Sequence, residues 1–372
     1  MPEPLKNQYN KSYILRIFSA LKAEKIEATE DKFLNKIFVK KWEDLELKDR
    51  IRHIASVLNA YLSTTFDAKA EQVISITNQL RKTKHPGDGY LAIFLPQIIE
   101  SNGLEFMPKS CYVFESITDF TTCEFAVRPF IEKYPVEMMQ QMLKWTKHTN
   151  EHVRRLSSEG CRPLLPWGGV LQDLKVNPTP ILPILENLKN DNSEYVRRSV
   201  ANNLNDISKN NPEVLLELYK KWKKAPEKTQ ALLKHASRTL LKAGNKHALN
   251  YFGWFYDEDL QIKNLDYTKK VSWSGKFEFS FALLNKSNIS RKVRLEYAIY
   301  FLKANGTQSK KVFQISNFNL PPDEEKSFQT SFNFKPITTR TYHSGNHGFG
   351  LIVNGIEVNR ENFQLIKKSN KT

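Results

Sequence analysis

The chain has 372 residues and a mass of 43.3 kDa, a length that predicts two or three domains. Hydrophobic residues make up 40% and charged residues 26%, which excludes a chain that is disordered or collagen-like throughout. The 56 Lys and Arg against 40 Asp and Glu give a net charge of +16, which favours a polyanionic partner. No apolar run is long enough to span a bilayer, and the first 25 residues lack a signal-peptide core, so we expect neither membrane binding nor secretion.

The cysteines are few and their spacing is uninformative. Cys111, Cys123 and Cys161 are an odd number without a CxxC pair. The sequence therefore predicts no disulfide framework and no structural zinc. Together with the missing signal peptide, this favours a reducing cytoplasmic compartment.

The basic excess is confined to the last two thirds of the chain. Residues 1–125 hold 17 basic and 17 acidic side chains, whereas residues 126–250 hold 21 against 12 and residues 251–372 hold 18 against 11. These two blocks carry +9 and +7. One interpretation is a surface that binds a polyanion, and the alternative is a lysine-rich surface that only aids solubility.

From about residue 12 to residue 250 the apolar residues recur with the period of a helix. The segments 51–63, 135–145 and 212–222 each place apolar side chains on one face, and the last two open with a proline in the first turn. Short polar breaks at 84–89, 190–193 and 210–211 separate helix-length pieces. This part of the chain is predicted to be all α-helical.

The helical part also contains an internal repeat. The pattern E-x-V-R-R at residues 151–155 returns 43 residues later at 194–198, and the prolines at 135 and 178 show the same shift. Pro135 and Trp145 recur as Pro212 and Trp222 with the same spacing. Repeats of roughly 34–47 residues, each of two or three helices, are typical of a HEAT-like repeat solenoid.

After about residue 265 the apolar period changes from that of a helix to that of a strand. The segments 276–284, 293–302, 311–318, 327–334, 347–355 and 356–362 are predicted strands separated by turn residues. About seven short strands in a hundred residues favour an immunoglobulin-like sandwich. We thus expect an all-α HEAT-like repeat solenoid in residues 1–255, an all-β immunoglobulin-like sandwich in residues 265–365, and a basic tail at 366–372.

Charged side chains line the helices of the two repeats. Arg155 and Glu159 are i,i+4 neighbours and Arg162 lies beyond them, while Arg198 and Asp206 lie two turns apart in the next repeat. Stacked repeats place these two stripes side by side. Paired arginines are well suited to bind phosphate, because one guanidinium can donate to two phosphate oxygens at once and stays positively charged. The alternative is a solvated helix face of i,i+4 ion pairs.

Two further segments favour nucleic acid. Trp167 stands among prolines and glycines in 162–169, which predicts a rigid turn whose indole stacks on a base, sugar or cation, although it could also fill a gap between repeats. Residues 221–246 hold eight basic side chains and the single acid Glu227. Lys234, His235, Arg238 and Lys242 are expected on one helical face, where they attract a phosphate backbone without reading sequence.

Motifs for cofactor or metal chemistry are missing from the sequence. It contains no GxGxxG, no GxxxxGK[ST], no HExxH and no GxSxG. His343 and His347 are close in sequence, but a turn between strands explains them as well as a metal site does. We expect no metal and no cofactor.

Four segments carry a resemblance to a known family: 45–58, 123–135, 150–168 and 193–212, of which EHVRRLSSEGCRPLLPW is the most specific. The chain resembles the bacterial AlkC-like DNA alkylation-repair glycosylases, relatives of the AlkD-like enzymes built from HEAT-like repeats. A C-terminal immunoglobulin-like domain occurs in part of that family, and 341–355 is similar to its recurring motif. The resemblance covers essentially the whole chain, except that residues 60–110 align weakly.

The resemblance implies a monofunctional DNA-3-methyladenine glycosylase, which hydrolyses the N-glycosidic bond of cationic N3-alkylated bases in duplex DNA. It implies an active-site cleft at Glu124, Glu159, Trp167 and Asp206, in which carboxylates and an aromatic face stabilise an oxocarbenium-like transition state. Which carboxylate activates water is left open. The alternative from another class is a non-catalytic HEAT-repeat scaffold that binds nucleic acid or an acidic protein.

The resemblance and the charge pattern also give expectations about partners. Alkylated double-stranded DNA is the expected partner of a cytoplasmic, nucleoid-associated bacterial monomer without an obligate protein partner. A single lesion-binding cleft requires no dimer. The residues expected to bind DNA are Arg154, Arg155, Arg162, Arg197, Arg198, Lys234, His235, Arg238, His343, Asn346 and His347.

Overall fold

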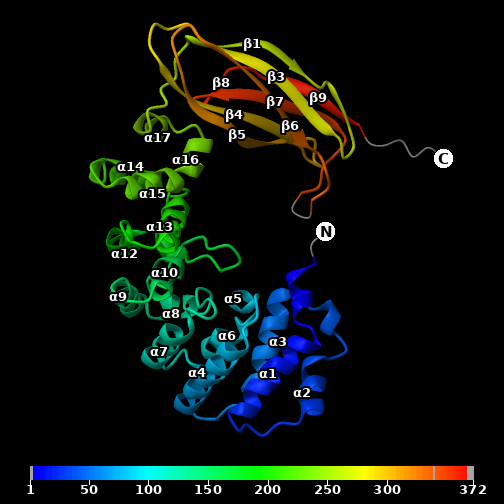
Figure 1. Ribbon diagram of the computed structural model, residues 1–372, viewed down its shortest axis with the longest axis vertical. Helices are drawn as coiled ribbons and strands as arrows, with labels where there is room; N and C mark the ends of the chain where they lie inside the picture. The colour runs from blue at the N-terminus through cyan, green and yellow to red at the C-terminus, as the bar shows by residue number, and fades with distance from the viewer. Residues whose placement is uncertain (1–2, 338–339, 367–372) are drawn as a thin grey trace, which may run out of the picture. The chain divides into compact units, whose positions relative to one another are not determined.

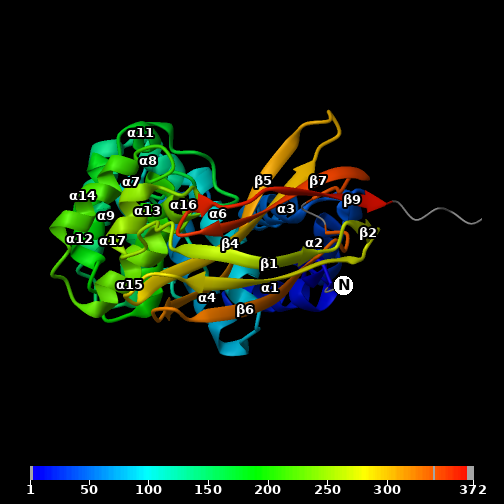
Figure 2. The ribbon, with the colours of Figure 1, turned by 90° about the horizontal axis from the view of Figure 1, so that it is seen from above.

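The computed structural model describes residues 3–337 and 340–366, in which helices precede strands along the chain (Figures 1 and 2). Its contacts divide the chain into two compact units. The helical unit comprises residues up to Asn211 together with Lys224–Ala236, and the β unit comprises Pro212–Lys223 together with residues from Ser237 onward. The predicted fold class is confirmed, whereas the domain limits at 255 and 265 stay a prediction. Of the predicted basic tail, residues 367–372 lie outside the described residues.

The helices are short and follow one another closely. The first part of the chain holds η1 (Leu5–Gln8), α1 (Lys11–Ala23), α2 (Glu30–Ile37), η2 (Trp42–Asp44), α3 (Leu47–Asn59), α4 (Phe66–Thr83), α5 (Asp88–Leu91), α6 (Phe94–Asn102), α7 (Met107–Ile117), α8 (Arg128–Lys133) and α9 (Pro135–Trp145). It continues with α10 (Glu151–Glu159), α11 (Gln172–Val176), η3 (Thr179–Ile181), α12 (Leu182–Leu188), α13 (Glu194–Ile207), α14 (Pro212–Lys221), α15 (Glu227–Ala236), α16 (Arg238–Lys242) and α17 (Lys246–Tyr251). None of the helices in the described ranges is long and apolar enough to cross a membrane.

The predicted repeat corresponds to equivalent helices. The two copies of E-x-V-R-R open α10 and α13, which pack against each other, and α13 also packs against α15. The shared valines, Val153 and Val196, are completely buried. The predicted polar breaks at 190–193 and 210–211 fall between helices, whereas the break at 84–89 overlaps the start of α5 at Asp88. The stacked repeat is therefore confirmed within the helical unit.

The basic segment 221–246 differs from its prediction. It contains two helices, since α15 ends at Ala236 and α16 begins at Arg238. Ser237 between them has φ −82° and ψ 0°, and its side chain is buried and shares a hydrogen bond with Tyr219. Lys234 and His235 thus lie at the end of α15 and Arg238 and Lys242 in α16, so the single helix expected to carry all four is wrong.

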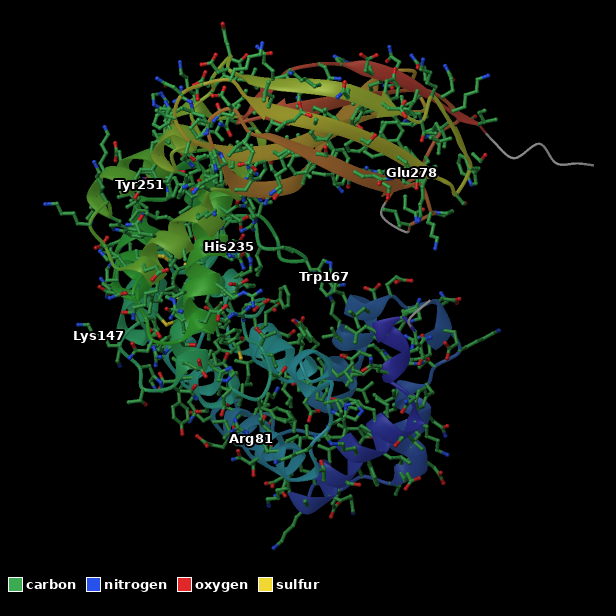
Figure 3. All side chains as sticks on the ribbon, turned by 45° about the horizontal axis from the view of Figure 1, so that its top comes forward. Arg81, Lys147, Trp167, His235, Tyr251 and Glu278 are labelled. Atoms are coloured by element: carbon green, nitrogen blue, oxygen red, sulfur yellow. The ribbon has the colours of Figure 1, made fainter. Side chains whose placement is uncertain are left out.

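A long loop follows α10 and carries Trp167 away from that helix toward α3, whose Lys48 bonds the Trp167 carbonyl (Figure 3). Trp167 has φ +64°, a left-handed conformation that bulky residues rarely adopt, and its side chain is 63% exposed. The loop is fastened at its base, where the Leu171 amide donates to the Pro163 carbonyl and the Gly168 amide to the Leu165 carbonyl. Trp167 therefore lies in a turn outside the helices, as predicted, and the rigidity of that turn stays a prediction.

The β unit is a sandwich of two sheets. One sheet has the order β1-β3-β6 and the other the order β2-β9-β7-β4-β5, with β8 paired to β7. All pairs are antiparallel except β2 with β9. The strands are β1 (Leu260–Tyr267), β2 (Lys270–Ser272), β3 (Lys276–Asn285), β4 (Arg291–Leu302), β5 (Gln308–Leu320), β6 (Glu325–Asn333), β7 (Gly345–Val353), β8 (Ile356–Glu357) and β9 (Glu361–Ile366).

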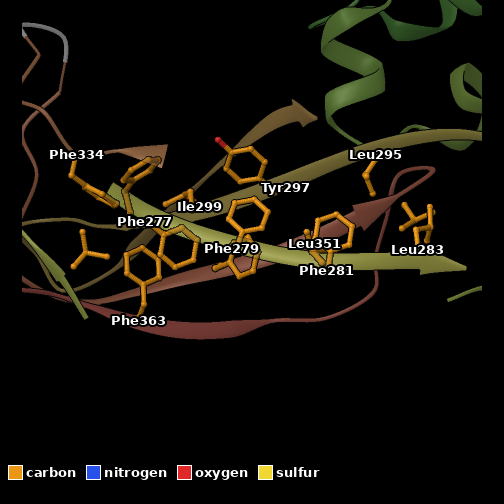
Figure 4. Packing of buried hydrophobic residues seen from close by; sticks show 14 of the residues in the cluster. Phe277, Phe279, Phe281, Leu283, Leu295, Tyr297, Ile299, Phe334, Leu351 and Phe363 are labelled. Atoms are coloured by element: carbon orange, nitrogen blue, oxygen red, sulfur yellow. The ribbon is translucent and has the colours of Figure 1, made fainter. Parts of the chain in front are cut away.

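Aromatic side chains fill the space between the two sheets (Figure 4). Phe277 of β3 stacks on Phe363 of β9 with ring centroids 4.2 Å apart, and Phe279 packs against Phe349 of β7 at 4.5 Å. The alternating apolar residues of 276–284 thus face the core, as their period predicts. The sequence did not indicate β1 and β2, whose residues are mostly exposed or half-buried.

A candidate active site in the helical unit

Three carboxylates predicted as catalytic lie in one row of alternating charge. Arg155 bonds Glu124, and its guanidinium also lies 3.5 Å from Glu159. Arg162 donates to Glu159 over 2.5 Å and to Asp206 over 2.8 Å. The row therefore joins the segment before α8 to α10 and α13. The structure brings together Glu124, Glu159 and Asp206 as the sequence predicts.

The row is almost completely withdrawn from solvent. Glu124, Glu159 and Asp206 are 7%, 4% and 2% exposed, and Arg162 is 6% exposed. Buried charges are tolerated when they are paired and hydrogen-bonded, and each of these groups has such a partner. Lys209, one turn after Asp206, donates to it over 2.8 Å and closes the row at the α13 end.

The carboxylate oxygens are not equally engaged. Both contacts of Arg162 and Arg155 with Glu159 fall on Oε1, and Arg155 and the Thr122 hydroxyl both bond Oε2 of Glu124. In the described part of the chain, no donor reaches the second oxygen of either glutamate. By contrast, Asp206 accepts from Arg162 on one oxygen and from Lys209 on the other. Each glutamate thus keeps one oxygen for water or a ligand.

The two arginines of the row stay charged despite their burial. Burial alone lowers the pKa of a guanidinium, but the Glu159 and Glu124 carboxylates beside Arg155 raise its pKa. Glu159 and Asp206 likewise raise the pKa of Arg162 against the effect of burial. Both side chains are therefore committed to carboxylates, although the sequence predicted that they contact DNA.

Trp167 lies outside this row. The side chain that separates Glu159 from Asp206 is Arg162, and the exposed indole of Trp167 stands further along the same loop. Buried Arg128 positions that loop, since it donates to the carbonyls of Gly160, Arg162 and Gly169. Lys48 bonds the Trp167 carbonyl from the other side. The arrangement links the carboxylate row to Trp167 through the backbone of one clamped loop.

Two exposed tyrosines near the row were missed by the sequence analysis. Tyr195 stacks its ring on Arg155, whose Cζ lies 5.2 Å from the ring centroid, and Tyr90 is 58% exposed on α5. Tyr195 occupies the variable position of the second E-x-V-R-R, where the first copy has His152. That difference between the copies was the available signal. Exposed aromatic side chains beside buried charges are typical of sites that stack on a ring.

The repeated arginine pairs divide their roles. Arg154 and Arg197 donate to the carbonyls just before their own helices, at 148–149 and 191–192. Arg154 also donates two hydrogen bonds to the Asp191 carboxylate. Burial raises the pKa of Asp191, but the hydrogen bonds from Arg154 and from the Ser193 amide lower it, and the net pKa is lowered. The first arginine of each pair thus fastens the loop between repeats.

Arg198, the second arginine of the second pair, is exposed on α13. No ion-pair partner of Arg198 occurs among residues 3–337 and 340–366. It lines a cavity of about 180 Å³ between α13 and α15 together with Arg197, Lys228 and His235. This basic hollow, which Glu194 also lines, is one place where the predicted DNA-binding set presents charge outward from the helical unit, and the exposed Lys234 on α15 is another.

The histidine motif of the β unit is structural in large part. His347 is completely buried on β7, where it stacks on Phe363 and contacts the His343 carbonyl through Nε2. Burial lowers the pKa of His347. Asn346 beside it is exposed. Within the described ranges no group of three His, Cys, Asp or Glu side chains is arranged to hold a metal ion.

Family comparisons agree with this architecture. Residues 51–240 match the profile of the DNA alkylation repair enzyme family, and residues 261–367 match the C-terminal Ig-like domain described for the uncharacterised protein YhaZ. The chain therefore belongs to the DNA alkylation repair enzyme family.

Two individual proteins are similar over nearly the whole chain. The uncharacterized protein YhaZ of Bacillus subtilis (strain 168) is 39% identical over 97% of this chain and 99% of its own length. The alkylpurine DNA glycosylase AlkC of Pseudomonas fluorescens, solved bound to DNA containing an abasic site analog, is 29% identical. Its structure matches with a TM-score of 0.92 and covers 98% of this chain and 100% of that one.

Proposed function

We propose that the protein is a monofunctional DNA glycosylase that removes cationic N3-alkylated bases, chiefly 3-methyladenine, from duplex DNA. The observation that carries the proposal is the buried row of three carboxylates in which two glutamates keep an unengaged oxygen. The similarity to a DNA glycosylase over the whole chain supports the same activity. A scaffold that only binds DNA needs the basic side chains for that binding but not the three buried acids.

The chemistry of the lesion suits this site. A base alkylated at N3 carries a positive charge, so the bond between C1′ and the base nitrogen is weakened without an added proton. When that bond breaks, its electron pair neutralises the base, and the deoxyribose becomes an oxocarbenium-like cation. Water then bonds to C1′ and its proton passes to a carboxylate. Negative groups fixed beside the sugar lower the energy of this transition state.

We assign the roles within the row from its hydrogen bonds. Glu159 and Glu124 each have a free oxygen, so they are the candidates that orient water and face the sugar cation. Asp206, with both oxygens engaged, acts by its charge and by holding Arg162 against Glu159. Trp167 offers an aromatic face to the cationic base, which cation–π attraction favours.

The experiment measures free 3-methyladenine released from methylated duplex DNA by the purified protein. Glu159→Gln and Asp206→Asn are each expected to lower the rate about 100- to 1,000-fold while DNA binding is kept. Glu137→Gln, an exposed acid on α9, is the matched control. Full excision by both site variants would contradict the assignment, and good DNA binding without any release would favour the scaffold.

For DNA contact we propose the basic hollow around Arg198 in the helical unit and the basic surface of the β unit, where Lys303 and Lys335 are exposed. Such contacts give affinity without sequence preference. A plot of log affinity against log salt concentration has a negative slope, and each lost phosphate contact makes that slope shallower by about 0.9. Lys303→Gln and Lys335→Gln test the β unit, and an unchanged slope in both variants would remove it from the interface. The protein is proposed to act as a cytoplasmic monomer.

A further inference from the structure

The helix α9 carries two apolar faces. One face packs into the interior of the helical unit through Met138, Met142 and Trp145. The other face holds Val136, Met139 and Leu143, which follow one another at spacings of three and four residues and therefore lie along one side of the helix. Val136 is 64% exposed, and the other two are only partly buried. The described part of the chain thus covers the first face completely and leaves the second one open.

This open face of α9 forms one wall of a groove of about 590 Å³ in the helical unit. Residues of α8, α11, η3 and α12 supply the other walls. Three of the lining residues are prolines in the first turns of α9, η3 and α12, namely Pro135, Pro180 and Pro183. Because proline has no N–H, these helix starts add apolar surface and leave fewer unpaired donors in the groove.

The groove is separate from the proposed catalytic groups. In Figure 1, α9 and α12 lie on one side of α10 and α13, and the loop that follows α10 extends on the other side. Figure 3 shows Lys147, just after α9, and Trp167 on opposite sides of the same helices. Neither Trp167 nor any of the three carboxylates of the row lines the groove. A ligand held at the row therefore does not occupy it.

The charges in the groove have the opposite sign to the net charge of the protein. Two exposed acids, Glu132 and Asp173, line it, and no Lys, Arg or His within the described ranges does. Neither acid has a salt-bridge partner among the residues that the structure describes, and Lys133 beside Glu132 pairs with Glu105 instead. In residues 126–250, where 21 basic side chains outnumber 12 acidic ones, this local reversal makes the groove repel phosphate and attract cations.

We propose that this groove binds a protein partner, which presents an amphipathic helix with Lys or Arg along the edge of its apolar face. Helices recognised in grooves use apolar anchors at i, i+3, i+4 and i+7, and the open face of α9 offers apolar side chains along a matching length. The apolar walls take up the anchors, and the carboxylates of Glu132 and Asp173 select the basic flank. This inference goes beyond the proposed function and does not depend on it.

The first experiment measures binding of a synthetic peptide to the full chain by fluorescence anisotropy, without DNA. The peptide is an amphipathic helix of Leu and Lys with about four turns, and its counterpart has Glu in place of every Lys. Val136→Arg places a cation and a longer side chain in the groove wall, so it is expected to weaken binding of the Leu/Lys peptide about tenfold or more. Val39→Arg, at an exposed valine between α2 and η2, is the matched control.

The second experiment tests the charge of the groove. Neutralising both acids, by Glu132→Gln together with Asp173→Asn, is expected to weaken binding of the Leu/Lys peptide about three- to tenfold, as for the loss of two exposed ion pairs. This difference should shrink at high salt, which screens exposed charges. The matched control is Glu30→Gln together with Asp31→Asn, which removes the same two charges from the exposed start of α2.

Three outcomes overturn the inference. The Leu/Lys peptide fails to bind, it binds Val136→Arg as well as the natural chain, or the Leu/Glu peptide binds equally well and is equally sensitive to Val136→Arg. The rival occupant is a second copy of this chain, so a dimer in sedimentation that Val136→Arg dissociates also overturns it. An unchanged melting temperature of Val136→Arg excludes unfolding as the cause of lost binding. Release of 3-methyladenine by this variant should be unchanged, so the groove and the proposed activity are tested separately.

Discussion

Arg162 provides the sharpest test, because the sequence and the structure give it different roles. The sequence places it among the DNA-contacting arginines, whereas the structure buries it between Glu159 and Asp206. Arg162→Met leaves two buried carboxylates without their main partner, a change that costs about 3–5 kcal/mol. Lys209 and Arg155 still contact these acids, so we expect the lower end, about 3 kcal/mol. For a unit of this size that corresponds to a fall in Tm of about 6–12 °C.

The assay combines thermal unfolding, followed by the helical circular dichroism signal, with DNA affinity at several salt concentrations. Arg198→Met is the matched control, since the same change on an exposed side chain is expected to cost within about 0.5 kcal/mol. Arg198→Met should instead make the dependence of log affinity on log salt concentration shallower by about 0.9. If Arg162→Met lowered the salt slope and left Tm unchanged, Arg162 would contact phosphate and the structural account of the row would be refuted.

Three further predictions concern buried titratable groups. Burial raises the pKa of the Cys111 and Cys161 thiols to about 12 and also raises the pKa of Cys123. A thiol reagent at neutral pH should therefore modify none of the three cysteines in the native protein and all three after unfolding. The lowered pKa of His347 means that the unfolded chain binds the extra proton, so the β unit should lose stability as pH falls below 6.5, and His347→Phe should remove that loss. The raised pKa of Glu100 has the opposite sign: stability should fall as pH rises from 4.5 through that raised pKa, and denaturant unfolding of Glu100→Gln should lack this fall.

Much of the fold was predictable because its signals are local. The shift of 43 residues between two copies of E-x-V-R-R reports that α10 and α13 are equivalent, and their buried valines show why the pattern repeats. The change of period near residue 265 reports the sandwich. By contrast, β1 has a bulge between Lys263 and Asp266 and only one fully buried residue, so it lacks the alternation that identifies a strand. The interruption at Ser237 was also hidden, since a small buried polar residue leaves no mark on an amphipathic pattern.

The site was predictable in its members but not in its connections. Sequence spacing placed Arg155 and Glu159 on one face, yet the partner of Arg155 that lies outside its helix is Glu124, 31 residues away. Ion pairs between different repeats depend on how the helices stack, and helix stacking cannot be predicted from the spacing of residues along the chain. For the same reason the sequence treated Arg154 and Arg155 alike, although one fastens a loop and the other enters the row.

The way in which the row is paired bears on which bases the proposed enzyme removes. All three carboxylates are ion-paired with a guanidinium or an ammonium group, so the contacts of the row are those of charged pairs. A neutral purine leaves only when it is protonated, which requires a general acid. An N3-alkylated base already carries the charge that such an acid would deliver. Discrimination between damaged and normal bases would then come from the charge of the lesion, and the row would act on the sugar cation that remains.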